Sequence, residues 1–330
     1  MKKVLITGSS GFIGSFLVEQ SIERGYNTVA GIRSSSSMEY LKETSASLFI
    51  TDLSDKESIK KNLLEFDRFD YIIHNAGITK TCDKILFDKV NYINTKNLVE
   101  ALIELDRIPE KFILISSLAA YGPGRNGNIP IKLSDSPLPI SIYGESKLKT
   151  EKYLKSIKGF PYLIFRPTGV YGPREKDYFV MYQSIKSGLE TYVGSREQYI
   201  SFIYVKDLVQ ILITSLESNS VRKSYFVSDL KDYTAVEFNE IVKNELGKKT
   251  ISIVFPKFFV KMIAFLGEKI SCLLSRNIPT LNTEKYKDIS QRNWLCDSSD
   301  LVKDFDFKPD YDLRNGIKET IDWNKKQGLL

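Results

Sequence analysis

The chain has 330 residues, of which 42% are hydrophobic, and its formal net charge is +6. This apolar content suffices for a large buried core, and the mild positive charge, spread along the chain, favours an anionic ligand over a nucleic-acid surface. Since His74 is the only histidine, a histidine-based catalytic triad and a multi-histidine metal site are nearly excluded.

Three cysteines, at 82, 272 and 296, show no metal-like spacing, and residues 2–8 run directly into an apolar strand pattern without a signal-peptide pattern. A sparse, odd set of cysteines is typical of a reducing compartment. We therefore expect a cytoplasmic protein without a bound metal.

Short β-branched runs alternate with helical patterns through the first half of the chain. The predicted strands are 3–7, 28–32, 48–51, 71–77, 112–117 and 162–165, and the predicted helices are 12–24, 90–105 and one that starts near 143. Near-continuous apolar strands in this alternation predict an α/β fold with a doubly wound parallel sheet, covered by helices on both faces.

The strand and helix pattern loosens after about residue 171, which predicts a smaller, C-terminal substrate-binding lobe. We assign residues 1–170, together with about 200–228 returning to the sheet, to a dinucleotide-binding domain. Residues 171–199 and 229–330 are assigned to the lobe.

The segment TGSSGFIG (7–14) joins the first strand to the first helix and contains Gly8, Gly11 and Gly14. Gly8 would allow a tight turn, Gly11 would let the backbone approach a pyrophosphate, and Gly14 would let the helix pack closely on the strand. The spacing is one residue wider than the commonest fingerprint. Because a strand precedes and a helix follows, we expect a Rossmann dinucleotide site rather than a tight turn without a ligand.

The second strand is followed by Arg33 and four serines, beginning with Ser34. NAD-binding chains usually carry an acidic residue here, which hydrogen-bonds the ribose 2′-OH. Arg33 could instead pair with a 2′-phosphate, and Ser34 and its neighbour could donate hydrogen bonds to it. We therefore expect NADP(H) in preference to NAD(H). In a compatible interpretation, Ser36 caps a short helix with Glu39 in a capping box.

Three tyrosine–lysine pairs have the i, i+4 spacing that places both residues on one helical face: Tyr143–Lys147, Tyr92–Lys96 and Tyr182–Lys186. A neighbouring ammonium can lower the pKa of a phenol and make it a usable acid or base. Only Tyr143 follows, across one loop, a strand that ends in serines, and that end of a parallel strand faces the ligand crevice. We therefore assign catalysis to Tyr143 and Lys147, and packing or surface roles to the other pairs.

Together these motifs resemble the extended short-chain dehydrogenase/reductases of the NAD-dependent epimerase/dehydratase superfamily. The matching elements occur in the family's order over residues 1–208, whereas the C-terminal third matches only loosely. They are TGSSGFIG, DL (52–53), HNAG (74–77), VNYINTKNL (90–98), SSLAAYG (116–122), YGESK (143–147), RPTGVYGPR (166–174) and FIYVKDL (202–208).

The resemblance implies a catalytic triad of Ser117, Tyr143 and Lys147, with Asn91 as a further catalytic residue, although Asn94 replaces a usual glycine. It also implies a homodimer packed through the helices at 90–105 and 145–157. With Arg33 and Ser34, the expected cofactor contacts are Gly8, Gly11, Phe12, Ile13, Gly14, Asp52, Leu53, Asn75, Ala76, Gly77, Ser116, Tyr143, Lys147, Pro167 and Val170. The expected substrate pocket contains Thr79, Leu118, Gly169 and Ile200.

Two departures from the family pattern bear on the substrate. Family members that act on nucleotide-diphosphate sugars carry an asparagine where this chain has Gly169, and an arginine where it has Ile200. Arg174 or Arg196 could compensate for the missing charge. The chain therefore looks more like the dihydroflavonol-reductase and 3β-hydroxysteroid-dehydrogenase branch, whose substrates are apolar ketones or alcohols.

The segment 255–274 is rich in aromatic and aliphatic residues, with Lys257, Lys261 and Glu268 on one helical stripe. These charges argue against a transmembrane span. The segment is expected to be a core or pocket-lid helix, with peripheral membrane contact as the alternative.

Three functions remain open. The first is NADP(H)-dependent reduction of a ketone, or oxidation of a secondary alcohol, on a small or apolar, lipid-like substrate. The second is nucleotide-sugar epimerisation or dehydration with a tightly bound cofactor, and the third is non-catalytic dinucleotide sensing. The presence of Ser117, Tyr143 and Lys147 disfavours the third.

Overall fold

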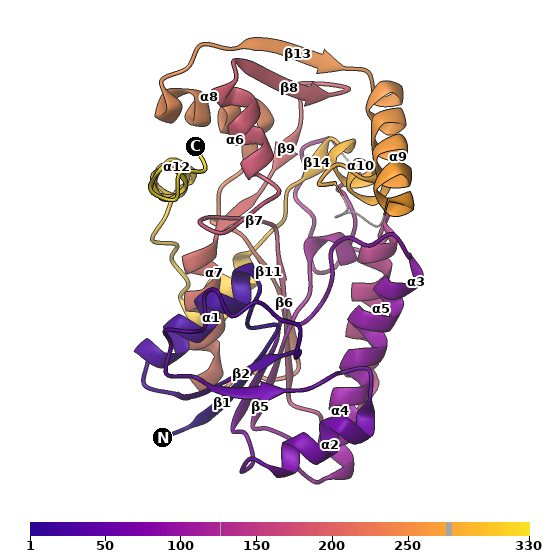
Figure 1. Ribbon diagram of the computed structural model, residues 1–330, viewed down its shortest axis with the longest axis vertical. Coiled ribbons are helices and arrows are strands. Elements are labelled where there is room, and N and C mark those ends of the chain that lie inside the picture. Colours follow the sequence, from indigo (N-terminus) through magenta and orange to yellow (C-terminus); the bar gives the residue numbers. More distant parts are fainter. Residues whose placement is uncertain (126, 275–278) are drawn as a thin grey trace.

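A seven-stranded sheet forms the centre of the computed structural model, which describes residues 1–125, 127–274 and 279–330 (Figure 1). The strand order is β11-β6-β5-β4-β1-β2-β3, and all neighbours run parallel. The strands are β1 (Lys3–Thr7), β2 (Asn27–Ile32), β3 (Ser47–Ile50), β4 (Tyr71–His74), β5 (Lys111–Ile115), β6 (Tyr162–Pro167) and β11 (Lys223–Val227). This confirms the predicted α/β class with a doubly wound parallel sheet.

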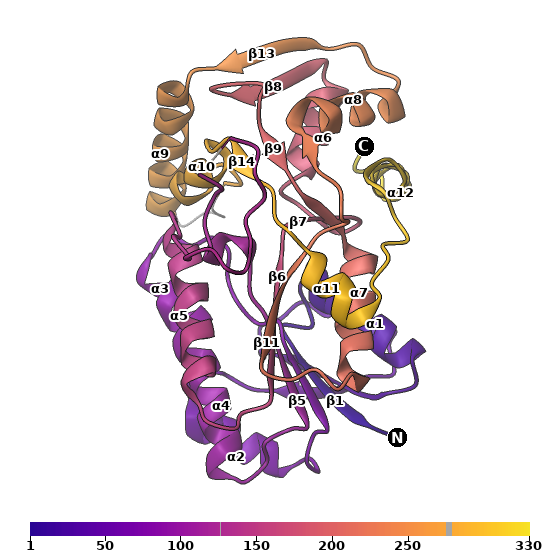
Figure 2. The same ribbon diagram turned by 180° about the vertical axis from the view of Figure 1, so that it is seen from behind.

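Helices cover both faces of the sheet (Figures 1 and 2). Side chains alternate along each strand, so Val4 of β1 joins one core and Leu5 joins the other. The first core includes α1 (Phe12–Glu23), α7 (Val205–Thr214) and α11 (Ser299–Phe305). The second core includes α2 (Lys56–Leu64), α4 (Asn94–Glu104) and α5 (Ile142–Ser156). Burial on both faces explains why these strands read as continuous apolar runs.

A smaller lobe lies beyond the carboxyl ends of the central strands (Figure 1). Its sheets pair β8 with β13, β7 with β10, and β9 with both β12 and β14. An aromatic core that includes Tyr171, Tyr182, Phe202 and Phe238 holds it together. The elements are β7 (Gly169–Tyr171), α6 (Phe179–Lys186), β8 (Leu189–Val193), β9 (Tyr199–Ile200), β10 (Phe202–Tyr204), β12 (Tyr233–Thr234), α8 (Ala235–Leu246), β13 (Ile251–Phe255), α9 (Lys257–Leu273), α10 (Thr283–Ile289), β14 (Asn293–Trp294) and α12 (Leu313–Lys326).

Two local predictions differ from the structure. The helix expected at 90–105 begins as a π-helix, η1 (Asp88–Ile93), which follows α3 (Ile85–Phe87) and continues as α4. No helix follows Ser36, so the predicted capping box is wrong: the Ser36 hydroxyl accepts a hydrogen bond from the Arg33 amide instead. The remaining short helices are η2 (Leu118–Ala120) and η3 (Ser215–Glu217).

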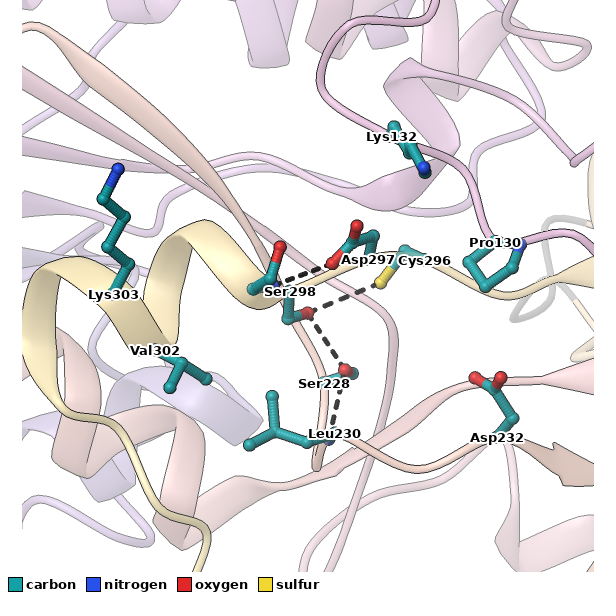
Figure 3. Close-up of a pocket in the computed structure, with 11 residues that line it drawn as sticks. Pro130, Lys132, Ser228, Leu230, Asp232, Cys296, Asp297, Ser298, Val302 and Lys303 are labelled. Carbon is teal, nitrogen blue, oxygen red and sulfur yellow. Dashed lines mark hydrogen bonds between the residues drawn. The ribbon is translucent and has the colours of Figure 1, made fainter.

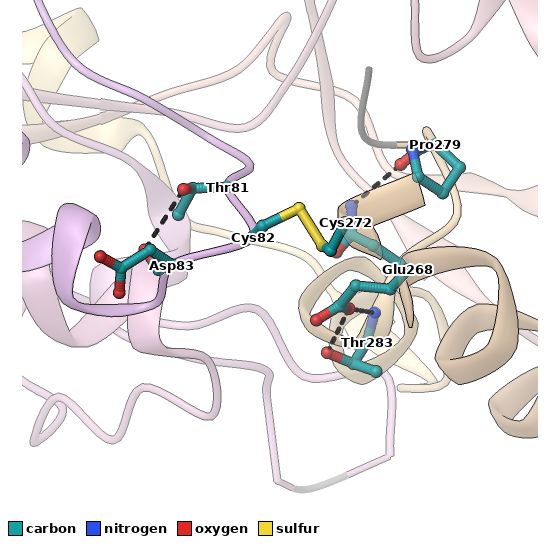
Figure 4. Close-up of a disulfide and its surroundings, with 8 residues drawn as sticks. Thr81, Cys82, Asp83, Glu268, Cys272, Pro279 and Thr283 are labelled. Carbon is teal, nitrogen blue, oxygen red and sulfur yellow. Dashed lines mark hydrogen bonds between the residues drawn. A yellow bond between two sulfur atoms is a disulfide. The ribbon is translucent and has the colours of Figure 1, made fainter. Parts of the chain in front are cut away.

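A disulfide links Cys82, in the loop between β4 and α3, to Cys272 on α9 (Figure 4). The two residues are 190 positions apart in the sequence, and the third cysteine, Cys296, is buried as a free thiol. The sequence did not predict this disulfide, because three widely spaced cysteines do not indicate which two would pair. The bond removes the cysteine-based argument for a reducing compartment.

The apolar helix α9 has 17 residues. Neither α9 nor any other helix of the described ranges is long and apolar enough to cross a bilayer.

Candidate active site

The glycine loop after β1 is shaped by close backbone contacts. Gly8 has a φ of +69°, and a Cβ there would lie 2.9 Å from the backbone of Ala76. A Cβ on Gly14 would collide with the Gly8 carbonyl oxygen, so helix α1 and this loop are in direct contact. At Gly11, by contrast, a Cβ would meet only the Gly8 carbonyl oxygen at 3.4 Å. Among the described residues, this contact leaves Gly11 more open than Gly8 or Gly14, and the loop therefore fits an approaching pyrophosphate.

The N-terminus of α1 leaves its backbone donors available. Phe12 and Ile13 open the helix, its N-cap residue Gly11 makes no side-chain capping bond, and the first turn contains no acidic residue. Uncapped N–H groups and the helix dipole both favour a bound anion at this position.

The ends of β2 and β3 place Arg33, Ser34 and Asp52 at the surface, with Leu53 half-buried. Hydrogen bonds from Ser54 lower the pKa of Asp52, and the nearby positive charge of Arg33 lowers it further. Arg33 and Ser34 thus remain exposed at the carboxyl edge of the sheet, where a ribose 2′-substituent would lie in this fold.

The segment after β4 contacts both the glycine loop and helix α5. The Asn75 amide donates to the Gly8 carbonyl at 3.3 Å, and the Ala76 N–H donates to the Thr7 hydroxyl at 3.2 Å. A Cβ at Gly77 would lie 2.9 Å from Asn91 Oδ1 and 3.3 Å from Lys147 Nζ. A larger residue at 77 would therefore displace one of these two side chains.

Tyr143 and Lys147 lie one turn apart at the start of α5. The Lys147 ammonium donates to the Ile115 carbonyl at 2.9 Å and lies 6.0 Å from the centroid of the Tyr143 ring. Ser117, the N-cap residue of η2, lies close enough to the phenol for its hydroxyl to lower the pKa of Tyr143. Tyr143 and Lys147 therefore lie side by side, with Ser117 near the phenol.

The electrostatics of the pair differ from the prediction. Burial raises the pKa of Tyr143 to about 12, and the Ser117 hydrogen bond only partly opposes this shift. Burial also lowers the pKa of Lys147 to about 8, with Glu151 acting in the opposite direction. The expected lowering of the phenol pKa by Lys147 is not found, because desolvation of the phenolate is the largest effect.

Asn91 connects the π-helix to the catalytic helix. Its amide accepts from the Ile78 N–H at 2.8 Å and donates to the Ile78 carbonyl at 3.1 Å. It also donates to the Ser146 hydroxyl at 2.9 Å, which in turn donates to the Tyr143 carbonyl. The π-turn of η1 contains this residue, and such turns often occur at functional sites.

Two acidic residues of α10 approach the start of α5, and the sequence contained no signal for them. The Glu284 carboxylate accepts a 2.6 Å hydrogen bond from the Ile142 N–H, directly before Tyr143. Burial raises the pKa of Asp288 to about 6, and its negative charge contributes to the raised pKa of Tyr143. This wall of the site comes from the C-terminal third, where the family resemblance is weakest.

Ser116 is directed into the protein rather than into the crevice. Its hydroxyl donates to Glu151 at 2.5 Å, and Glu151 also accepts two hydrogen bonds from Arg166, at 2.8 and 2.6 Å. Both charged side chains are fully buried. The sequence signal for a buried ion pair was Arg166 itself, which lies in the otherwise apolar strand β6. The sequence did not indicate that Glu151 is its partner.

The residues expected in the substrate pocket are mostly packed against the protein itself. Leu118 is buried in a small cluster with Tyr121 and Phe226, and Ile200 packs against the aromatic core of the lobe. Thr79 is exposed.

Two of the expected cofactor contacts follow one another at the end of β6. Pro167 is buried at the end of this strand, and Val170 is half-buried in β7.

Gly169 has a specific packing reason. The hydroxyl of Tyr178 occupies the position that a Cβ at 169 would take, and the Phe202 ring lies 3.1 Å from that position. An asparagine at 169 would therefore require Tyr178 to move.

Arg174 and Arg196 were considered as replacements for the arginine that is missing at position 200. Neither makes a contact that supports binding of a pyrophosphate. Arg174 donates to Ser15 and Glu19 of α1, at 2.8 Å each, and stacks over the rings of Phe16 and Tyr40. These contacts hold the Arg174 side chain against α1. Arg196 is exposed and lies 5.6 Å from the centroid of the Tyr192 ring.

The two other tyrosine–lysine pairs lie apart from this arrangement. Tyr92 packs edge-on against Tyr153, with the Lys149 ammonium 4.2 Å above its ring. Tyr182 is fully buried in the lobe core against Phe238. These environments fit the packing roles predicted for them.

A cavity of about 510 Å³ lies at the start of α11 (Figure 3). The hydroxyls of Ser228 and Ser298 are 2.9 Å apart at its wall, and the Cys296 thiol lies 3.7 Å from Ser298. Burial raises the pKa of this thiol to about 12, so it is not a reactive thiolate at neutral pH. No residue of the predicted site lines this cavity.

The comparisons with known proteins agree with the motifs. A family model described as the NAD dependent epimerase/dehydratase family matches residues 4–227, so the chain belongs to this family. The UDP-glucose 4-epimerase of Vibrio cholerae is 26% identical, over 97% of this chain and 94% of that protein. A crystal structure of UDP-glucose 4-epimerase from Thermotoga maritima with UDP-glucose has the same fold, with a TM-score of 0.80 and 23% identity over 98% of this chain and 99% of that one.

Two other relatives are named for lipid substrates. The ceramide reductase of Caulobacter vibrioides is 24% identical, over 99% of this chain and 96% of that protein. The human sterol-4-alpha-carboxylate 3-dehydrogenase, decarboxylating, is 26% identical over 66% of this chain and 58% of that protein. The comparisons as a whole favour the epimerase alternative over the ketone reductase, because UDP-glucose 4-epimerases match with higher significance.

Proposed function

We propose that this chain is an NAD(P)-dependent enzyme that interconverts a ketone and a secondary alcohol. The observation that supports the proposal is the pairing of Tyr143 with Lys147 at the carboxyl end of β5, with Ser117 close enough to lower the pKa of the phenol. A nicotinamide cofactor, when bound, supplies or accepts the hydride in such a reaction.

Each residue has a defined part in this chemistry. Tyr143, whose pKa is about 12, is protonated at neutral pH and donates its proton to the ketone oxygen in the reductive direction. Ser117 hydrogen-bonds the same oxygen and orients it. The Lys147 ammonium, held by the Ile115 carbonyl, stabilises the negative charge that develops on the phenol.

The cofactor-binding residues support NADP(H) in preference to NAD(H). The end of β2 presents Arg33 and Ser34 at the surface and lacks a carboxylate directly after Ile32. A guanidinium pairs with a 2′-phosphate, whereas a carboxylate would repel it.

For the substrate, the packing supports an apolar, lipid-like ketone or alcohol. Tyr178 fills the position of the amide that sugar-nucleotide enzymes carry at Gly169. Ile200 packs in the aromatic core, and Arg174 is bonded to α1. A buried pyrophosphate would thus lack a strong partner on this side of the site, which is costly. The similarity to a ceramide reductase over nearly the whole chain supports the same class.

A nucleotide-sugar epimerase or dehydratase is the second candidate. The nearly full-length similarity to UDP-glucose 4-epimerases supports it, and the exposed Arg196 remains available to a phosphate. Both candidate reactions use the same acid–base residues. They differ in the substrate that the lobe binds and in whether the cofactor is consumed or regenerated within the reaction.

Two measurements separate the candidates. Calorimetry with UDP and with dTDP, in the presence of NADP⁺, should show weak or no binding if the substrate is lipid-like. An assay of NADPH consumption over long-chain and sterol-like ketones, beside UDP- and dTDP-sugars, should show net oxidation with a lipid ketone. Low-micromolar binding of either nucleotide, with sugar conversion and no net cofactor turnover, would establish the epimerase instead.

A further inference from the structure

Helix α9 presents an unusually apolar surface to solvent at the outer edge of the lobe (Figure 1). The exposed fractions of Phe258 and Leu273, near its two ends, are 76% and 86%. Large exposed side chains continue between them at Met262, Phe265, Leu266 and Ile270. A contiguous apolar patch of this kind usually marks an interaction site.

The opposite side of α9 is firmly attached to the protein. Val260 and Ala264 are buried, and Glu268 accepts hydrogen bonds from the N–H and hydroxyl of Thr283, at 2.8 and 2.6 Å. Cys272 is bonded covalently to Cys82 (Figure 4). Since these contacts hold one face, the apolar face of α9 cannot simply rotate inward, and it stays without a partner in the described chain.

The exposed charges of α9 are positive. Lys269 lies within the apolar face, whereas Lys257 and Lys261 share a helical stripe with Glu268, which is bonded to Thr283 on the inner side. The Lys269 ammonium lies 5.8 Å from the centroid of the Phe265 ring, within the apolar face. Long lysine stems can lie along apolar surface while their ammonium groups reach polar headgroups.

We propose that α9 docks on the surface of an anionic lipid bilayer, lying in its plane with the apolar face buried. A helix with a broad apolar face and lysines as its exposed charges has the properties of an interfacial helix. A second copy of this chain fits less well, because two-fold packing of the face on itself would bury the ammonium of Lys269 in both copies. This inference does not depend on the substrate, since the binding can be measured without turnover.

The test is flotation of the full chain, with its disulfide intact, with vesicles of phosphatidylcholine and phosphatidylglycerol in a 7:3 ratio. The protein should float with these vesicles and much less with pure phosphatidylcholine. The double variant Phe258→Ser, Leu273→Ser should lose at least about tenfold in partitioning, because two large apolar side chains no longer enter the bilayer. Replacing Lys269 by glutamine should weaken binding about fivefold, because this lysine lies within the apolar face.

The matched control is Leu64→Ser, Ile129→Ser, which removes two apolar side chains that are each 58% exposed elsewhere on the surface. This control should float like the unmodified protein. Absence of flotation, or equal flotation of the α9 double variant, would overturn the proposal. Sedimentation velocity completes the test: a dimer that dissociates in the α9 double variant but not in the control would assign the face to self-association and overturn it too.

Discussion

The Lys147 ammonium donates a 2.9 Å hydrogen bond to the carbonyl of Ile115, the last residue of β5. This bond joins the catalytic helix to the central sheet at the strand end where Ser117 follows. Because the sheet is rigid and packed on both faces, it fixes the ammonium 6.0 Å from the centre of the Tyr143 ring. The relative position of acid and cation is therefore set by the core of the fold rather than by a loop.

Replacing Tyr143 by phenylalanine should lower turnover roughly 10²–10⁴-fold while leaving cofactor affinity nearly unchanged. The hydroxyl supplies the proton, whereas the ring does not hold the dinucleotide. Steady-state rates and cofactor titration of the same protein check both parts. Tyr92→Phe and Tyr182→Phe are the controls, since Tyr92 packs on Tyr153 and Tyr182 lies in the lobe core. A loss of turnover in either control equal to that of Tyr143→Phe would contradict the assignment.

Changing Arg33 to aspartate should weaken NADPH binding at least about tenfold and leave NADH binding equal or stronger. The new carboxylate would repel the 2′-phosphate and could accept a hydrogen bond from the ribose. Position 33 is suited to this change because it is exposed, whereas Ile32 is buried in the core and an aspartate there would destabilise the fold. Fluorescence titration with both cofactors is the measurement. If the unmodified protein binds NADH as tightly as NADPH, Arg33 does not select the cofactor.

Gly169→Ala should destabilise the protein by about 1–3 kcal/mol, because the added methyl group meets the Tyr178 hydroxyl. Tyr178→Phe removes that hydroxyl, so the double variant should recover at least half of the loss. Urea unfolding of the four proteins in this double-mutant cycle measures the coupling. Additive effects of the two substitutions would show that Tyr178 is not the obstacle at this position.

Arg166→Met should reduce the free energy of unfolding by about 3–5 kcal/mol, because it leaves the fully buried Glu151 without its bidentate partner. The double variant Glu151→Leu, Arg166→Met should be less destabilised, since no unpaired charge remains. Arg292→Met, which breaks an exposed pair with Glu197, is the control and should cost less than about 1 kcal/mol. Equal effects at the buried and exposed pairs would rule out this account.

Acidification should destabilise the unmodified protein more than a His74→Gln variant. Burial lowers the pKa of His74 to about 3, with the Lys147 charge as a second cause, and its ring is bonded to Thr7 and Thr95 at 2.8 Å each. Between pH 6.5 and 3 the unfolded chain binds a proton at His74 that the folded chain does not. Stability is therefore lost as the pH falls through this range. Melting temperatures at pH 7 and 4.5 test this, and an equal decrease in both proteins would contradict it.

The elements that local patterns determine could be predicted from the sequence. The central strands are buried on both faces, so their apolar runs stood out, and the glycine loop could be placed because a strand preceded it and a helix followed. The position of the Tyr143–Lys147 pair at the end of β5 could also be predicted, because the carboxyl ends of parallel strands share one edge of the sheet. That rule is topological and does not require knowledge of side-chain packing.

The parts that depend on contacts between distant segments could not be predicted. The bonds of Arg174 join it to α1, more than 150 positions earlier in the chain. The packing of Tyr178 on Gly169 joins residues closer in sequence, but it depends on how the lobe folds. Glu284 binds the Ile142 N–H, and the charge of Asp288 acts on Tyr143, both from a region with weak motifs. Even the pKa of Tyr143 was predicted in the wrong direction, because the helical spacing to Lys147 is visible in the sequence and the burial of the phenol is not.

The disulfide between Cys82 and Cys272 closes the backbone into a covalent ring, with Ser117, Tyr143 and Lys147 inside it and the glycine loop outside. A protease that cuts once anywhere between residues 83 and 271 would open the ring without releasing a fragment. The nicked chain would keep its full mass on a non-reducing gel and separate into two pieces only after reduction. Ser117, Tyr143 and Lys147 would thus remain covalently attached to the glycine loop even after the polypeptide between them has been cleaved.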